Sequence, residues 1–300
     1  MQAQGVGYNA GWIGDNWKID IGRTPENFLV TDVVGGIRVD GDIDDFSWAL
    51  IASRRPVTNT TLSYAGLFDP NTKKIWGGAR QTGVGFNLGF NNGSPIGVWS
   101  SWQYQMITGE NIQDNTKFQG QIGAYWNVWK DPKNISNVDL SLNTLYMSYK
   151  NFQDELTLGH GGYFSPQSYS SVSLPITFYG RYSGWSYSVR VSGAYSISKV
   201  NDAPFYPNDR DLQLRAEAEQ NTTGISPIYT GANSNSISYG ISSIVEKRVT
   251  DHWSVGAKVQ IQRSPFYNPS NIGLYLKYDF NEHWSPIATP PVPPETFANY

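Results

Sequence analysis

The chain of 300 residues has no cysteine, few charged side chains and no long apolar run. Charged residues make up 16% of the sequence, whereas soluble domains usually carry about 25%. No apolar stretch is long enough to form a membrane-spanning helix. A net charge of −3 argues against nucleic-acid binding, which needs a concentrated basic surface. The lack of cysteine fits a cell-envelope protein without disulfides.

What the chain does have is alternation of apolar and polar residues with a period of two. In residues 117–129 one set of alternate positions is mainly apolar, and the other set is mainly polar. Successive side chains of a strand point to opposite faces, so such a segment has one apolar and one polar face. The pattern recurs along most of the chain. It predicts an all-β protein, a transmembrane antiparallel up-and-down β-barrel of the outer-membrane type.

The connections and the aromatic residues support the barrel. Short connections at 14–16, 41–42, 92–93, 131–132, 182–184 and 250–251 alternate with longer ones near 55–79, 150–167 and 197–234. Short turns at one end and long loops at the other are typical of outer-membrane barrels. Aromatic side chains cluster beside the short turns, all with the apolar parity; they are Trp17, Trp48, Phe90, Trp126, Phe178, Trp185 and Trp253. They form the aromatic girdle expected at a membrane interface.

About 13 strands are expected. They cover residues 5–12, 17–23, 31–40, 45–54, 80–90, 96–106, 116–129, 137–149, 168–179, 184–196, 235–249, 253–264 and 270–280. Bacterial single-chain barrels have an even number of strands, so we expect earlier strands, and a signal peptide, to be missing from the chain. Residues 208–220 predict a short helix in the longest loop. We assign 1–280 to the barrel and 281–300 to a proline-rich, extended tail.

Two motifs with catalytic or metal-binding potential are weak. Asp40, Asp42 and Asp44 have the spacing of a calcium loop, but Asp45 and Ile51 stand where its Gly and Glu belong, so we expect a polar turn and no metal. His160 lies in a glycine-rich stretch without a Gly-x-Ser-x-Gly elbow or a metal-binding pair of histidines. We therefore expect no enzyme and no cofactor; the 150–167 loop is instead a candidate for a gate over the pore.

The polar alternate positions of the predicted strands supply the candidate binding site. Its charges are mixed, and amides and aromatic rings make up much of the rest, which suits a neutral polyhydroxylated chain better than an anionic or cationic one. The candidate lumen-facing residues are Trp99, Gln103, Gln119, Gln121, Tyr125, Asn127, Tyr169, Arg190, Gln260 and Tyr275. The candidate gating residues of the 150–167 loop are His160, Tyr163 and Phe164. The 197–234 loop is a second candidate for the gate.

Several longer strings carry a family resemblance. ASRRPVT at 52–58, LSYAG at 62–66, WGG at 76–78 and LTLGHGGYFSPQ at 156–167 resemble the barrel of the bacterial cellulose synthase operon protein C. The similarity runs from about residue 5 to residue 280. It implies a sixteen-stranded channel in the outer membrane that follows a periplasmic array of tetratricopeptide repeats. About 13 strands would then lack the first three, and the chain has no helical repeat array.

The resemblance implies export of a nascent cellulose chain, a β-1,4-glucan, delivered by the inner-membrane cellulose synthase complex. The partners expected are therefore the glucan, outer-membrane lipid, the periplasmic repeat segment and that complex. Three alternatives stay open at this point. They are export of another exopolysaccharide such as poly-N-acetylglucosamine, a barrel hydrolase with His160 as its base, and a purely structural or adhesive barrel.

Overall fold

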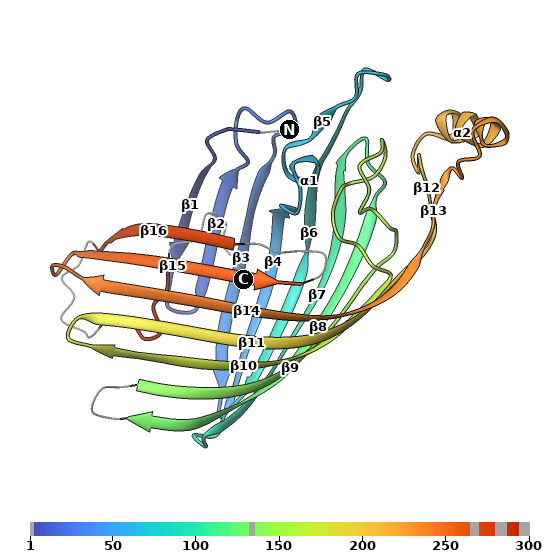
Figure 1. Ribbon diagram of the computed structural model, residues 1–300. Helices are drawn as coiled ribbons and strands as arrows, with labels where there is room; N and C mark the ends of the chain where they lie inside the picture. The colour runs from blue at the N-terminus through green and yellow to red at the C-terminus, as the bar shows by residue number, and fades with distance from the viewer. Residues whose placement is uncertain (1–2, 132–135, 265–269, 280–286, 294–300) are drawn as a thin grey trace.

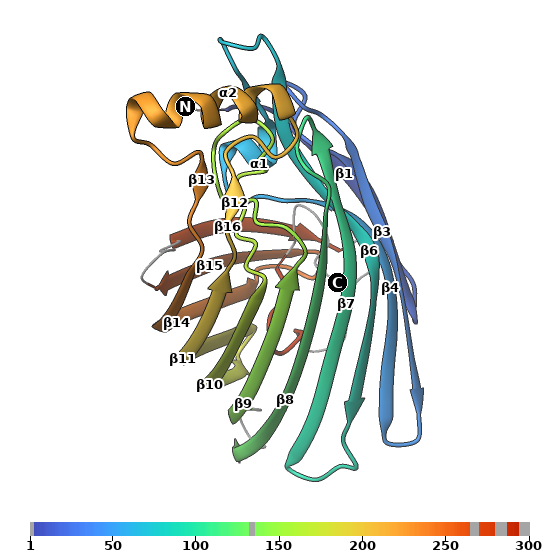
Figure 2. The same cartoon turned by 90° about the vertical axis from the view of Figure 1, so that its right-hand side faces the viewer.

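The computed structural model describes residues 3–131, 136–264, 270–279 and 287–293. Thirteen long strands form one antiparallel sheet, in which each pairs with the long strand before and after it in the chain, and one further two-residue strand pairs beside this path. The sheet is curved and strongly twisted. In Figure 1 its strands turn from nearly vertical at β1–β4 to nearly horizontal at β14–β16, and Figure 2 shows these two groups facing one another across the concave side.

The long strands follow an up-and-down order. They are β1 (Tyr8–Ile13), β2 (Trp17–Arg23), β3 (Val33–Ile43), β4 (Phe46–Pro56), β6 (Ile75–Phe90), β7 (Ile96–Glu110), β8 (Asn115–Asp131), β9 (Ser136–Tyr149), β10 (Ser168–Tyr182), β11 (Trp185–Val200), β14 (Ala232–Arg248), β15 (Trp253–Arg263) and β16 (Ser270–Tyr278). The short elements are α1 (Thr61–Ala65), β5 (Leu67–Phe68), β12 (Ala203–Pro204), α2 (Arg210–Thr223) and β13 (Ile228–Tyr229).

The thirteen strands predicted from alternation are confirmed. Several extend further toward the long loops than predicted; β6, for example, begins at Ile75 and not at residue 80. The predicted helix is confirmed as α2, whose N-cap carboxylate, on Asp209, accepts a hydrogen bond from the Leu212 amide at 3.1 Å. The short elements α1, β5, β12 and β13 were not predicted, because five or fewer residues carry no measurable periodicity.

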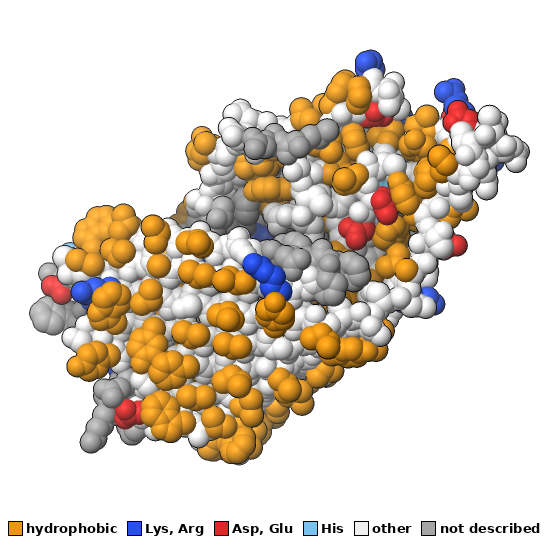
Figure 3. All heavy atoms as spheres, in the orientation of Figure 1, with side chains coloured by type: hydrophobic (Ala, Val, Ile, Leu, Met, Phe, Trp, Pro, Cys, Tyr) orange, Lys and Arg blue, Asp and Glu red, His pale blue; other side chains and the backbone are white. Residues whose placement is uncertain are grey.

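The outer face of the sheet is hydrophobic. Large apolar side chains project from alternate positions of neighbouring strands and are half-exposed, for example Val84 on β6, Trp102 on β7 and Ile122 on β8. Figure 3 shows rows of them over the strands that face the viewer. This is the apolar band that a barrel presents to lipid. The expected girdle lies at its short-turn end, where Trp17, Trp126, Trp185 and Trp253 are exposed on the same face.

Strands β1 and β16 form the two edges of the sheet. Within the described residues no ladder joins them. All six residues of β1 are exposed, and the apolar side chains of β16 reach 84% exposure at Leu274.

The buried core lies at one end, where the long loops fold inward. Its residues come from α1, from the ends of β6 and β7, from the segments just after β4 and β7, and from the 150–167 loop; they are Val57, Leu62, Trp76, Ala79, Ile107, Ile112, Leu158 and Tyr163. Burial of apolar area is the main favourable contribution to such packing. The 150–167 loop is therefore docked onto the inner wall of the sheet.

Candidate functional site

All ten predicted lumen residues lie on the concave face of the sheet. Residues that pair across an antiparallel ladder point to the same side. One row of paired positions joins Gln103, Gln119, Met147 and Tyr169 on β7 to β10. We call the face that carries this row the lumen face.

A second row crosses the sheet nearer the short turns. It begins with Asn127 paired to Asp139 and continues through Thr177 to Arg190. From there it runs through Ser242 to Gln260. The structure thus brings Asn127, Arg190 and Gln260, which are far apart in sequence, into one row. Gln121 lies between the rows, paired to Ser101.

Three lumen rings lie over glycines of the neighbouring strand. A Cβ atom on Gly123 would come within 2.5 Å of Trp99, and one on Gly97 within 2.4 Å of Tyr125. On Gly256 it would come within 2.0 Å of Tyr275. Each ring therefore occupies the space that a side chain would fill, and it covers the wall without projecting far from it. Sequence parity placed the rings on this face, but the glycine partners follow only from the register.

Polar contacts fix the orientation of two of these rings. The amide nitrogen Nδ2 of Asn91 donates to Tyr125 Oη at 2.5 Å. Tyr275 Oη donates to Glu246 Oε2 at 2.8 Å, and Lys277 Nζ lies 2.7 Å from Glu246 Oε1. Glu246 is only 1% exposed, so the carboxylate needs both contacts to offset its burial.

Arg55 was missed by the sequence prediction. It lies one residue beyond the predicted end of its strand, although the alternation Ile51–Ser53–Arg55 continues into it. Its guanidinium forms a two-bond ion pair with Asp20 on β2, at 2.7 and 2.6 Å, and both residues are 7% exposed. A Cβ on Gly36, in the intervening strand β3, would lie 2.8 Å from Arg55 Nη2. Glycine at this position lets the arginine cross β3.

Two cavities line the lumen face. The larger, about 820 Å³, lies beneath the 150–167 loop and is bounded by β4, β6, β7, β8, β9, β15 and β16. Its polar lining includes Arg55, Asn59, Gln81, Lys117, Lys258 and Gln260. The smaller, about 350 Å³, is lined mainly by β4, β6 and β7. Of the predicted residues, Gln103 lines the smaller cavity, and Tyr163, Phe164 and Gln260 line the larger.

The three gating residues differ in exposure. His160 and Tyr163 are buried, whereas Phe164 is 36% exposed and meets the lumen residue Tyr169 edge-on at 5.7 Å between ring centres. Burial raises the pKa of the Tyr163 hydroxyl, which accepts a hydrogen bond from Asn115 at 3.2 Å. The 150–167 loop thus exposes Phe164 to the lumen, while the buried His160 and Tyr163 anchor it, with Tyr163 also forming part of the cavity wall.

His160 has aromatic neighbours. Its Nε2 lies 2.9 Å from the carbonyl oxygen of Pro204, and because a carbonyl only accepts, Nε2 carries the proton. The rings of Phe152 and Tyr229 meet it edge-on, and burial lowers its pKa. Full burial leaves no room for a substrate beside the imidazole, so this environment does not favour the hydrolase alternative.

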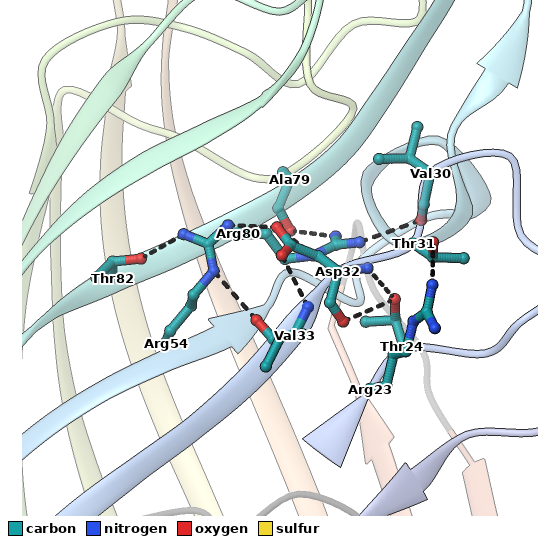
Figure 4. A network of polar contacts seen from close by, with 10 residues as sticks. All are labelled: Arg23, Thr24, Val30, Thr31, Asp32, Val33, Arg54, Ala79, Arg80 and Thr82. Carbon is teal, nitrogen blue, oxygen red and sulfur yellow. Dashed lines mark hydrogen bonds and ion pairs between the residues drawn. The ribbon is translucent and has the colours of Figure 1, made fainter. Parts of the chain in front are cut away.

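On the outer face, Arg54 and Arg80 pair with Asp32 and hold the segment between β2 and β3 against β4 and β6 (Figure 4).

On the lumen face, Asp40 and Asp42 lie within β3 and not in the predicted turn, and Asp40 pairs with Arg38.

Part of the predicted tail lies at the short-turn end. Within its described residues, 287–293, the Ala288 carbonyl accepts a hydrogen bond from the lumen-face hydroxyl of Ser186 at 2.6 Å. Ile287 is buried. The remaining tail residues, 281–286 and 294–300, lie outside the described part.

No group of three or more His, Asp or Glu side chains in the described part of the chain could hold a metal ion. No helix there is long and apolar enough to cross a membrane.

Residues 1–281 match the family described as the C-terminus of cellulose synthase operon protein C. The chain belongs to this family. Cellulose synthase operon protein C of Escherichia coli (strain K12) is 34% identical over 302 residues, which cover 99% of this chain and 25% of that protein. The Pseudomonas fluorescens protein of the same name is 29% identical over 279 residues, covering 92% of this chain and 21% of that protein. The chain thus spans about a quarter or less of these relatives' length.

A solved structure shares the fold of this cellulose synthase operon protein C region. It is described as a bacterial polysaccharide outer membrane secretin and superposes with a TM-score of 0.54 at 11% identity, covering 92% of this chain and 80% of that chain. At this identity the likeness concerns the fold alone. The barrel fold and the family together place the protein in the bacterial outer membrane.

Proposed function

We propose that the lumen face conducts a nascent β-1,4-glucan out of the periplasm. The observation that carries the proposal is the set of rings lying over glycines beside lumen amides, in a chain of the cellulose synthase operon protein C family. A glucan is neutral, with apolar C–H faces and hydroxyls around its edge. Rings can stack against the faces, while Gln103, Gln119 and Asn127 exchange hydrogen bonds with the hydroxyls.

The conduit acts without catalysis in this proposal. The ten predicted lumen residues guide the polymer, and the 150–167 loop, with Phe164 at the lumen, closes the outer mouth. A periplasmic tetratricopeptide-repeat segment and the inner-membrane cellulose synthase complex would deliver the chain. Residues 281–300 would then form a C-terminal segment distinct from the strand sequence, which contacts the barrel where Ala288 accepts a hydrogen bond from Ser186. Export of poly-N-acetylglucosamine, which becomes cationic where it is deacetylated, has less support, because no described residue in the lining of the larger cavity is acidic.

The test is current block in the full-length protein reconstituted in planar bilayers. Cello-oligosaccharides should interrupt the current, and Trp99→Ala with Tyr125→Ala and Tyr275→Ala should weaken the block roughly tenfold or more, since stacking contributes about 1 kcal/mol per ring. Trp102→Ala is the matched control, because this nearby tryptophan points to the lipid face and is 38% exposed.

Block that is unchanged in the triple variant would contradict the role of the rings. Absence of any current, with the loop intact and with the 150–167 loop shortened, would contradict a conduit altogether.

A further inference from the structure

The acidic residues of the lumen face are mostly neutralised within the wall. Asp20 pairs with Arg55 at 2.6 Å, Asp40 with Arg38 at 2.5 Å, and Glu246 with Lys277 at 2.7 Å. Asp139 accepts a hydrogen bond from Asn127 and does not line the larger cavity. In each of these three pairs the acidic and the basic side chain neutralise one another.

Lys117 and Lys258 have no such partner. Within the described residues neither forms an ion pair, and both line the 820 Å³ cavity. The third cation of the lining, Arg55, is already neutralised by Asp20. Among the residues that the structure describes, no acidic side chain lines the cavity. Two positive charges without an ion-pair partner among the described residues therefore face one partly open cavity.

Both ammonium groups are held close to the wall. Lys117 Nζ lies 5.9 Å from the centre of the Tyr149 ring. The stem of Lys258 runs beside Gly273, where a Cβ would lie 3.0 Å from its Cε. The two lysines come from β8 and β15, with β9, β10, β11 and β14 between them in the sheet.

A cleft lined by charge of one sign and walled by protein concentrates counter-ions, because field lines focus in the low-dielectric surroundings. We propose that Lys117 and Lys258 make this cavity an anion-selective constriction, which favours inorganic anions over cations. The inference rests on the proposed conduit, because selectivity has meaning only where ions pass. It extends that function by giving the conduit a preference for anions.

The experiment measures reversal potentials under a KCl gradient. The full-length protein is reconstituted in planar bilayers with the 150–167 loop intact or shortened, so that a closed loop does not hide the lumen. Near 0.1 M salt, where the screening length is about 10 Å, the chloride-to-potassium permeability ratio should be several-fold above one. Near 1 M salt, where that length is about 3 Å, the ratio should fall toward one.

Two double variants and a control test whether Lys117 and Lys258 cause the selectivity. Lys117→Gln with Lys258→Gln should bring the ratio close to one, and Glu at both positions should bring it below one. Lys247→Gln removes the same charge on the lipid face, where Lys247 lies over the Trp185 ring at 4.8 Å, and should leave the ratio unchanged.

The outcomes separate the two proposals. A conducting pore that is unselective or prefers potassium, or one whose preference for chloride survives the double Gln variant, overturns the inference and leaves the conduit standing. If the protein conducts no current with the 150–167 loop intact and none with the loop shortened, both proposals are overturned.

Discussion

Arg55 and Asp20 form the most deeply buried ion pair of the lumen wall, with side chains 8% and 6% exposed. Removing one partner of such a pair leaves a buried charge uncompensated, which typically costs about 3–5 kcal/mol. Arg55→Ala should therefore lower the unfolding free energy by an amount of this order. The change can be followed as the urea midpoint of the folded barrel in detergent or lipid.

Two further variants separate charge burial from the loss of an arginine. Asp20→Asn combined with Arg55→Gln should recover part of the loss, since no charge stays behind. Arg38→Ala should cost about 1 kcal/mol or less, because the side chain of its partner Asp40 is 35% exposed. Equal losses for Arg55→Ala and Arg38→Ala would show that burial of the first pair does not matter.

At the scale of elements, the 150–167 loop contains groups that titrate in opposite senses. Burial lowers the pKa of His160 from its ordinary 6.5. The neutral imidazole of His160 therefore contributes fully to docking of the loop above pH 6.5, and this contribution is lost as the pH falls below that value. Desolvation, with the charge of Glu155, raises the pKa of Asp154 to about 6, so its protonation favours the docked loop as the pH falls.

The variant His160→Gln isolates the histidine. Hydrogen exchange of residues 150–167 should lose more protection on acidification through pH 6.5 in the parent protein than in the variant, where the carboxyl groups alone titrate. His252→Gln serves as control, because that histidine lies at a short turn and bonds to the Asp279 carbonyl. A parallel pH response of His160→Gln and the parent would refute this role of His160.

Alternation predicted the strands and their faces because the period of two is a property of each strand alone. The docked position of the 150–167 loop could not be predicted in the same way. It depends on Leu158 and Tyr163 meeting Leu62 and Trp76, residues about a hundred positions earlier. Pairing of this kind comes from packing in space and leaves no periodic signal in the sequence.

For the molecule as a whole, the two faces of the wall can be distinguished with neighbouring residues of β8. Ile122 is 52% exposed on the outer face, and Gln121 faces the lumen. Arginine at a mid-membrane lipid-facing position costs about 2–4 kcal/mol. Ile122→Arg should therefore lower the unfolding free energy in lipid by this amount, whereas Gln121→Arg should change it little. If the ranking of the two variants were reversed, the assignment of faces would be wrong.

Gly36 has a consequence for how the sequence can vary among relatives. Its missing side chain leaves the path by which Arg55 reaches Asp20 two strands away. A larger residue at 36 would separate the pair and leave two buried charges, so it becomes tolerable only if 20 and 55 also change. Positions 20, 36 and 55 should therefore covary among related sequences, although no two of them are neighbours in the chain and the glycine itself carries no charge.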